Sequence, residues 1–242
     1  MGSCGQKIYF SVALYMSEVI VIAEGQSEQS FLKRVLAPYL SEHVCYIRAQ
    51  LIGTPGHKGG SVSFDRFSRD VGAALKQRKD TYISSMLDYF RLDSKWPGMN
   101  DLNQAMRLGR KIDKSEIRVI LQEKTLERLE ELFPQYSIPT RVLPYFSMHE
   151  FESLLFSDVT KLSEGLRRNI QDVQYVLDSF DGDPESINTD PSKAPSKVLE
   201  RLNPEYKKVL QGTLIATSIG IPKMQNKCSC FNHWINQLLA LS

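Results

Sequence analysis

Two acidic residues follow short apolar runs that are typical of buried strands. Glu24 comes directly after Val19–Ala23, and Asp88 comes directly after Tyr82–Leu87. The carboxyl ends of parallel strands converge on one edge of a sheet, which is the usual site in open α/β folds. Two carboxylates there repel each other unless a proton or a divalent cation lies between them, and their oxygens suit Mg²⁺ or Mn²⁺. These two residues alone leave two interpretations open: a metal site, or a helix-capping glutamate and a turn-forming aspartate. A third contributor at the same edge would strengthen the metal site.

Three more residues follow the predicted strand Arg141–Met148 and reach the same predicted edge. They are His149, Glu150 and Glu152. Either glutamate could complete the coordination of a metal or act as a general base. The histidine could bind metal, donate a proton or satisfy a backbone carbonyl, and the last of these is favoured for a single histidine.

Three further residues are weaker candidates. Glu28 lies one helical turn beyond Glu24, and it either reaches the ion through water or caps its helix. Lys58 lies in the glycine-rich loop Gly53–Ser61, which could cradle a phosphate although its spacing is not that of a P-loop. Lys197 could contact a nucleic-acid backbone. For both lysines the alternative is a solvated side chain.

Strand and helix patterns alternate through the first part of the chain, which predicts a parallel sheet with crossover helices. Helical spacing of apolar residues follows the first two strands, and one charged helix is predicted from about Asn100 to Phe133. Pro144 places the fourth strand at an edge or in a bulge, because proline donates no ladder hydrogen bond. The predicted strands are Val19–Ala23, Cys45–Ile52, Tyr82–Leu87 and Arg141–Met148.

Composition and organisation narrow the class of protein. The 242 residues carry 30 lysines and arginines against 28 acids, a net charge of +2, so no global basic field attracts nucleic acid. Four irregularly spaced cysteines and the lack of a long apolar run favour a cytoplasmic protein that does not span a membrane. We expect an extension over 1–15, an α/β core over 16–157, and a helical elaboration over 158–242 that could pack on the core as one unit.

Several spaced blocks of the sequence resemble a known family. They look like the signature blocks of an uncharacterised bacterial family with a TOPRIM-like fold. In order, the blocks are Val19–Glu28, Met86–Phe90 followed by Trp96–Gly98, His149–Asp158, Ala194–Lys197, and Phe231–Trp234. The resemblance runs from about Met16 to the end of the chain and implies a three-layer TOPRIM-like parallel-sheet core.

The resemblance also implies a site. TOPRIM proteins bind Mg²⁺ for phosphodiester chemistry through a glutamate after the first strand and acids after a later one. Glu24 matches the glutamate and Asp88 matches the first aspartate of an Asp-x-Asp element, but Phe90 takes the place of the second. A two-metal site would then need Glu150, Glu152 or Asp93 as a substitute. Members of this family resemble proteins encoded beside SMC/ABC-like ATPases in bacterial defence loci, which implies such a partner.

Two functions follow as hypotheses. The first is a Mg²⁺-dependent nuclease or related phosphoryl-transfer enzyme on DNA or RNA, the effector of an ATPase-linked anti-phage defence system. The second is a non-catalytic TOPRIM-like binding or regulatory subunit of an ATPase complex. Phe90 in place of an aspartate and the nearly neutral net charge motivate the second.

Overall fold

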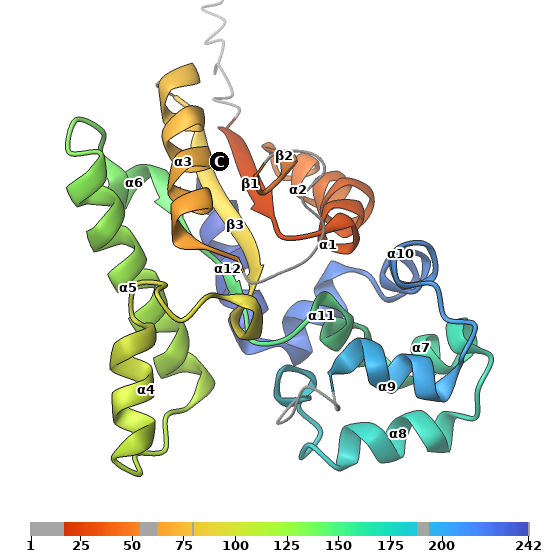
Figure 1. Ribbon diagram of the computed structural model, residues 1–242. Helices are drawn as coiled ribbons and strands as arrows, with labels where there is room; N and C mark the ends of the chain where they lie inside the picture. Colours follow the sequence, from red (N-terminus) through yellow and green to blue (C-terminus); the bar gives the residue numbers. More distant parts are fainter. Residues whose placement is uncertain (1–16, 54–61, 79, 188–193, 242) are drawn as a thin grey trace, which may run out of the picture.

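The computed structural model describes residues 17–53, 62–78, 80–187 and 194–241 (Figure 1). The predicted N-terminal extension over 1–15 and the predicted phosphate contact Lys58 lie outside the described residues. The predicted division into a core and a helical elaboration at residues 157 and 158 stays a prediction.

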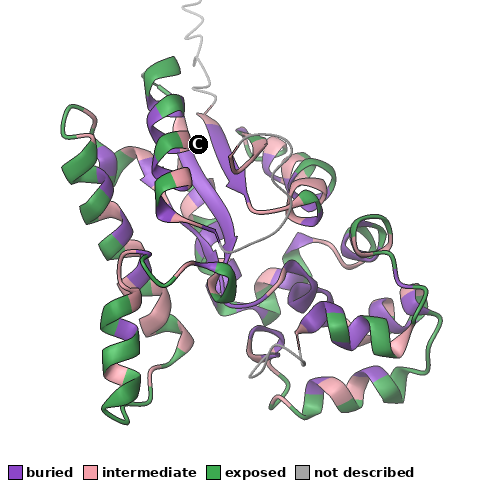
Figure 2. Cartoon of the chain, in the orientation of Figure 1, coloured by how far each residue is buried: buried purple, intermediate pink, exposed green. Residues whose placement is uncertain are grey.

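A parallel sheet forms the centre of the molecule, with strand order β2-β1-β3-β4 and with β5 pairing to β3 beyond β4. Its main strands are β1 (Ser17–Ala23), β2 (Cys45–Leu51) and β3 (Tyr82–Asp88). The last five residues of β1 are all buried, as expected for a strand covered on both faces (Figure 2). The predicted α/β class with a parallel-sheet core is confirmed.

The fourth predicted strand is interrupted. It consists of two short pieces, β4 (Val142–Leu143) and β5 (Phe146–Ser147), on either side of Pro144 and Tyr145. Proline has no N–H to donate, and the Tyr145 N–H donates instead to Ser85 Oγ at 3.0 Å. The expected place at the end of the strand order holds, because β4 and β5 pair only with β3.

Helices cover both faces of the sheet. After β1 the chain forms one continuous helical run, which begins at Gln26 with Gly25 as its N-cap. The run consists of α1 (Gln26–Phe31), the π-helical turn η1 (Leu32–Leu36) and α2 (Ala37–Ser41). α3 (Phe64–Gln77) then packs on β1 and β3 (Figure 1).

The helix predicted from about residue 100 to 133 is two helices, α4 (Met99–Arg107) and α5 (Lys114–Leu132). Gly109 adopts a positive φ of 75° just after α4, which a glycine tolerates at low cost. Asp113 then caps α5, because its Oδ1 accepts the Glu116 N–H at 2.9 Å. Both signals are in the sequence, and they outweigh the continuous helical periodicity. A short helix, α6 (Ile138–Arg141), leads into β4.

The described residues beyond 150 form helices and no strands, as predicted. They are η3 (Phe151–Ser157), α7 (Val159–Leu166), α8 (Ile170–Asp178), η4 (Pro184–Ser186), α9 (Pro195–Leu202), α10 (Lys208–Ile219), α11 (Ile221–Lys227) and α12 (Ser229–Leu239). None of the described helices is long and apolar enough to cross a membrane.

The last helix returns to the sheet. The Trp234 ring of α12 stacks on Tyr145 with ring centroids 4.3 Å apart, and its Nε1–H donates to Ser84 Oγ of β3 at 2.9 Å. In Figure 1, α12 lies behind the sheet and α3 lies in front of it. The sheet is therefore the middle of three layers, and the apolar stripe of the last helix docks on the core.

Candidate functional site

Glu24 and Asp88 meet at the carboxyl edge of the sheet. β1 and β3 are neighbours in parallel register, with Ala23 opposite Met86, so the residues that follow each strand lie side by side. The Asp88 backbone N–H donates to Glu24 Oε2 at 3.2 Å. The predicted juxtaposition of these two strand ends is thus present in the structure.

Asp88 is a buried carboxylate that also forms a turn. Its side chain accepts the Phe90 N–H at 2.9 Å, which is the turn-forming role that the sequence left open. The residue is only 8% exposed. Burial, then the charge of Glu24, raise the pKa of Asp88 to about 7, and the Phe90 N–H lowers it only in part. The carboxylate therefore lies where a negative charge is poorly stabilised.

Glu24 shares this electrostatic environment. Burial and the charge of Glu28 raise its pKa, while the Asp88 N–H and Arg91 oppose the rise. Arg91 Nε donates to Glu24 Oε1 at 3.0 Å. Each oxygen of the Glu24 carboxylate thus has one protein partner, and the pKa remains raised despite both.

Glu28 lies in the first turn of α1, and its carboxylate turns back toward the start of its own helix. Burial raises the pKa of Glu28, while the positive charge of Lys208 and the backbone N–H groups of Glu28 and Gly25 oppose the rise. This geometry fits the capping alternative. The charge of Glu28 also raises the pKa of Glu24, so Glu28 is part of the same cluster of acids as Glu24 and Asp88.

Glu150 and Glu152 gather around a lysine from the C-terminal helices. Lys208 Nζ lies 3.2 Å from Glu150 Oε1 and 3.2 Å from Glu152 Oε2. The Ser196 N–H, at the start of α9, donates to Glu150 Oε2 at 2.9 Å. Burial disfavours the charged form of Glu150, but Lys208 and Ser196 outweigh burial and lower its pKa. Glu150 is therefore ionised at neutral pH.

Glu152 is fully buried and poorly satisfied. Its residue exposure is 0%, and neither carboxylate oxygen has a hydrogen-bond partner of good geometry among the described residues. Burial, with the charges of Glu150 and Glu28, raises its pKa to about 8 although Lys208 opposes the shift. In turn, burial lowers the pKa of Lys208, but the surrounding acids outweigh burial and raise it. Lys208 thus stays protonated.

His149 is a buried neutral imidazole. Burial lowers its pKa to about 4, although a hydrogen bond with the backbone of Glu185 opposes the shift. Its ring stacks on Phe90, with centroids 5.3 Å apart and planes 15° apart. Which of the three roles His149 plays therefore stays a prediction. Because the ring is neutral at pH 7, it is not charged to act as a general acid.

Other candidates from the sequence lie on the surface or in local turns. Lys197 is exposed on α9 and pairs with Glu200 at 2.7 Å, in agreement with a solvated side chain. Asp93, considered as a substitute for the missing aspartate, accepts the Lys95 N–H at 2.9 Å in a local turn. Neither contact joins the acids at the sheet edge.

Two site residues were missed from the sequence. Lys208 is one lysine among many in a helical region, and nothing in its neighbourhood signals a partner in Glu150 or Glu152. Arg91 carried a usable signal, because it lies three residues beyond Asp88 at a strand end where acids were already expected. In the structure each of these cations contacts one of the two pairs of acids.

The side chains at this edge of the sheet are of the type that binds divalent cations. They offer hard carboxylate oxygens, and the charges of Glu24 and Asp88 disfavour each other in a desolvated position. A bound cation would remove that penalty. Within the described residues, however, no three His, Cys, Asp or Glu side chains already converge at metal-binding spacing. Glu24 and Asp88 are therefore the pair that would hold a metal. Glu28 is the next candidate ligand, because its charge acts on Glu24.

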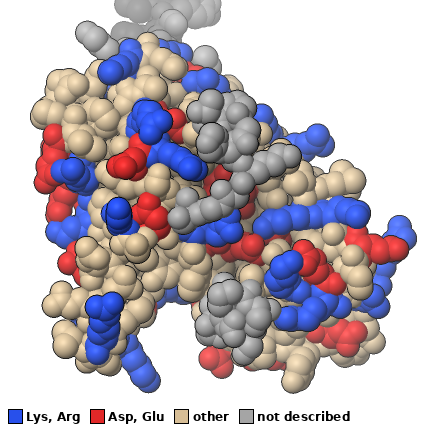
Figure 3. Space-filling model, in the orientation of Figure 1, with Lys and Arg blue, Asp and Glu red and all other residues tan. Residues whose placement is uncertain are grey.

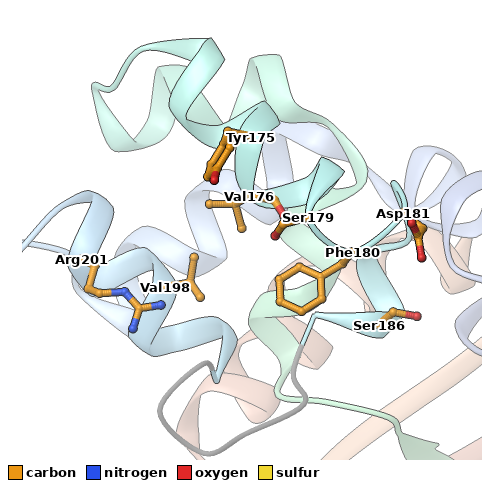
Figure 4. A pocket seen from close by; sticks show the side chains of 8 residues that line it. All are labelled: Tyr175, Val176, Ser179, Phe180, Asp181, Ser186, Val198 and Arg201. Atoms are coloured by element: carbon orange, nitrogen blue, oxygen red, sulfur yellow. Dashed lines mark hydrogen bonds between the residues drawn. The ribbon is translucent and has the colours of Figure 1, made fainter.

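The molecular surface shows no dominant charge of one sign on the face in Figure 3, where basic and acidic side chains alternate. A hollow of about 530 Å³ opens between α8 and α9, lined mainly by Tyr175, Val176, Phe180 and Val198 with Arg201 at its side (Figure 4). None of the predicted acids lines it. The hollow and the acid cluster therefore share no residues.

The family model described as "Domain of unknown function (DUF4276)" matches residues 23–239. No curated protein matches the chain. Among solved structures, the chain is similar to the "C-terminal region of the Burkholderia pseudomallei OLD protein", with a TM-score of 0.46 and 12% sequence identity. That alignment covers 94% of this chain and 100% of the other.

Proposed function

The chain belongs to the DUF4276 family, and from this premise we propose that it is a divalent-metal-dependent enzyme that cleaves phosphodiester bonds in DNA or RNA. One observation carries the proposal. Glu24 and Asp88 extend from adjoining parallel strands, and the Asp88 N–H lies 3.2 Å from the Glu24 carboxylate. The TOPRIM-like order of sequence blocks supports the same chemistry. Mg²⁺ and Mn²⁺ are the cations that such a carboxylate pair suits.

In this mechanism Glu24 and Asp88 would hold the cation. A bound divalent cation supplies Lewis acidity, which offsets the charge that develops on the phosphate oxygens. Two donors orient the Glu24 carboxylate: Arg91 Nε binds Oε1, and the Asp88 backbone N–H binds Oε2. Asp88, whose pKa is about 7, would have to release its proton to hold a cation, so we expect cation affinity to rise with pH through that range.

The second group of acids would act beside the first. Lys208 is a protonated ammonium whose side chain is 37% exposed, and such a group can donate to a phosphate oxygen. Glu150, which is ionised, holds Lys208 in place at 3.2 Å. Glu152, whose pKa is about 8, can hold or release a proton near neutral pH, so its pKa suits proton transfer better than that of Glu150.

The test is a cleavage assay with purified protein. Single-stranded and double-stranded DNA and RNA are incubated with the protein in Mg²⁺ or in Mn²⁺. We expect cleavage by the wild type and a loss of at least about 100-fold in Glu24→Gln, because the substitution removes a charged metal ligand. Asp113→Asn is the matched control, since Asp113 is an exposed helix cap and asparagine caps equally well. Undiminished cleavage by Glu24→Gln would contradict the proposed site.

We also propose an SMC/ABC-like ATPase as the partner that controls this activity, in an anti-phage defence system. The support is the resemblance of the sequence blocks to a family encoded beside such ATPases. The assay is therefore repeated with the ATPase and ATP. Cleavage that depends on ATP supports the partnership, and equal cleavage with and without the ATPase counts against it.

A second candidate function is a metal-free binding subunit of the same complex. Two observations favour it: Phe90 stands where a second aspartate is expected, and Lys208 already neutralises part of the charge of Glu150 and Glu152. A calorimetric titration with Mn²⁺ separates the two functions. Micromolar binding that disappears in Asp88→Asn supports the enzyme, and no binding to the wild type supports the subunit.

A further inference from the structure

Phe90 is an exposed aromatic ring at the edge of the acid cluster. It is 53% exposed, although it follows Asp88 by only two residues. Its backbone N–H is fixed on Asp88 Oδ1 at 2.9 Å, so the ring originates directly beside that carboxylate. Single exposed apolar side chains are common, and exposure alone says little. What sets Phe90 apart is that two other aromatic side chains pack against its ring.

The ring is held in place from one side. His149 stacks on it nearly in parallel, with a centroid distance of 5.3 Å and an angle of 15°. Tyr89 contacts it edge-on at 4.9 Å. His149 is itself buried, with only 7% of its surface exposed, so the protein around it holds this support in place. With one face on this support and about half of its area in solvent, Phe90 presents a pre-ordered apolar surface.

A positive charge adjoins this surface. Arg91 is the next residue, and its side chain is 48% exposed while it contacts Glu24. Sites for single-stranded nucleic acid combine an aromatic ring, on which a base stacks, with a cation near the backbone phosphates. A base inside a duplex already stacks on its neighbours and does not offer its face to such a ring. The pair of Phe90 and Arg91 therefore matches an unpaired nucleotide.

We propose that Phe90 is a stacking platform for an unpaired nucleobase, so that the substrate class of this site is single-stranded nucleic acid or an unpaired end. The inference rests on the proposed function, because it places the base next to a phosphate at Glu24 and Asp88. It also gives a role to the residue that replaces the second aspartate. A protein partner that covers the ring is the competing outcome of the test.

The experiment measures binding without cleavage. Fluorescence anisotropy follows a labelled 12-nucleotide oligothymidylate and a labelled blunt duplex of equal length, each in buffer with Ca²⁺ in place of Mg²⁺. The variants are Phe90→Leu, which keeps an apolar side chain but removes the aromatic face, and Phe90→Trp, which keeps stacking. Tyr46→Leu is the matched control, because Tyr46 is 44% exposed near the start of β2, at the opposite end of the sheet.

We expect Phe90→Leu to weaken binding of the single strand by about 5-fold to 100-fold, the range for loss of one stacked base. Duplex binding should change by less than about 2-fold, and Tyr46→Leu should resemble the wild type for both probes. Phe90→Trp should restore single-strand affinity, and its added fluorescence should be quenched as the unlabelled oligonucleotide is titrated in. Equal melting temperatures of the variants exclude loss of folding.

Three outcomes would overturn the inference. Unchanged single-strand affinity in Phe90→Leu would do so, and so would an equal loss for both probes. Retained nucleic-acid affinity with loss of binding to the ATPase would assign the ring to a protein interface instead. In each of these cases cleavage by the wild type leaves the proposed function standing. If the wild type binds and cleaves neither nucleic acid, the proposed function fails together with the inference.

Discussion

Replacing the charge of Asp88 should make the metal-free protein more stable at alkaline pH. Burial beside Glu24 raises the pKa of Asp88 from 3.8 to about 7 in the folded chain. Each pKa unit corresponds to about 1.36 kcal/mol, so ionisation of this group lowers the free energy of unfolding by at most about 4 kcal/mol above pH 7. In Asp88→Asn the side chain is neutral, and its oxygen can still accept the Phe90 N–H.

The sign of the pH dependence follows from the direction of the shift. The folded state binds the Asp88 proton more tightly than the unfolded state, so its contribution to stability is full below about pH 4. That contribution is lost progressively as the pH rises from about 4 to about 7. We therefore expect Asp88→Asn to be more stable than the wild type by about 2–4 kcal/mol at pH 8, and by about 1 kcal/mol at pH 4.5.

The assay is urea unfolding at both pH values, in EDTA, with Asp113→Asn as the control that keeps a helix cap. Adding Mn²⁺ should then stabilise the wild type and not Asp88→Asn, by about 2.7 kcal/mol at a concentration 100 times the dissociation constant. An Asp88→Asn variant that is no more stable than the wild type at pH 8 would refute the reasoning. So would a gain in stability that is equal at the two pH values.

Two other substitutions test the surroundings of the site. Glu185→Gln should lower the free energy of unfolding, measured in urea, by about 2–3 kcal/mol. The reason is that the buried Glu185 carboxylate accepts the backbone N–H groups of Cys230 and Phe231 at 3.0 and 2.9 Å. A loss below about 0.5 kcal/mol would contradict this role. Gly25→Ala should weaken Mn²⁺ binding about 10-fold in a calorimetric titration, because the added Cβ would lie 2.9 Å from Glu28 Oε2 and displace that carboxylate. The same substitution should lower the free energy of unfolding by at most about 1 kcal/mol. Unchanged Mn²⁺ affinity in Gly25→Ala would remove Glu28 from the site.

The meeting of Glu24 and Asp88 at the sheet edge could be predicted from the sequence, because the strand patterns and the rules of parallel sheets agree there. A run of apolar, largely β-branched residues identifies β1 as a buried parallel strand, and parallel neighbours end on the same edge. That reasoning requires only the ends of β1 and β3, and it predicts that Glu24 and Asp88 meet. Gly109 and the cap at Asp113 also encode the break between α4 and α5, although helical periodicity alone predicts one continuous helix there.

The second group of acids could not be derived in the same way. Glu150 and Glu152 follow a strand, but their partners come from helices packed beside them, namely Lys208 of α10 and Ser196 of α9. Helical periodicity assigns a face to such residues but does not say which distant element will cover it. The ion pairs therefore depend on tertiary packing, which one sequence does not specify by spacing.

The central claim is that Glu24 and Asp88 bind a divalent cation together. Anomalous diffraction from crystals grown with Mn²⁺, recorded for the wild type and for Glu24→Gln, tests it most directly. We predict a Mn²⁺ peak in contact with both carboxylates in the wild type and no peak there in Glu24→Gln. A wild-type crystal with no Mn²⁺ between Glu24 and Asp88, at a concentration that supports catalysis, would contradict the account.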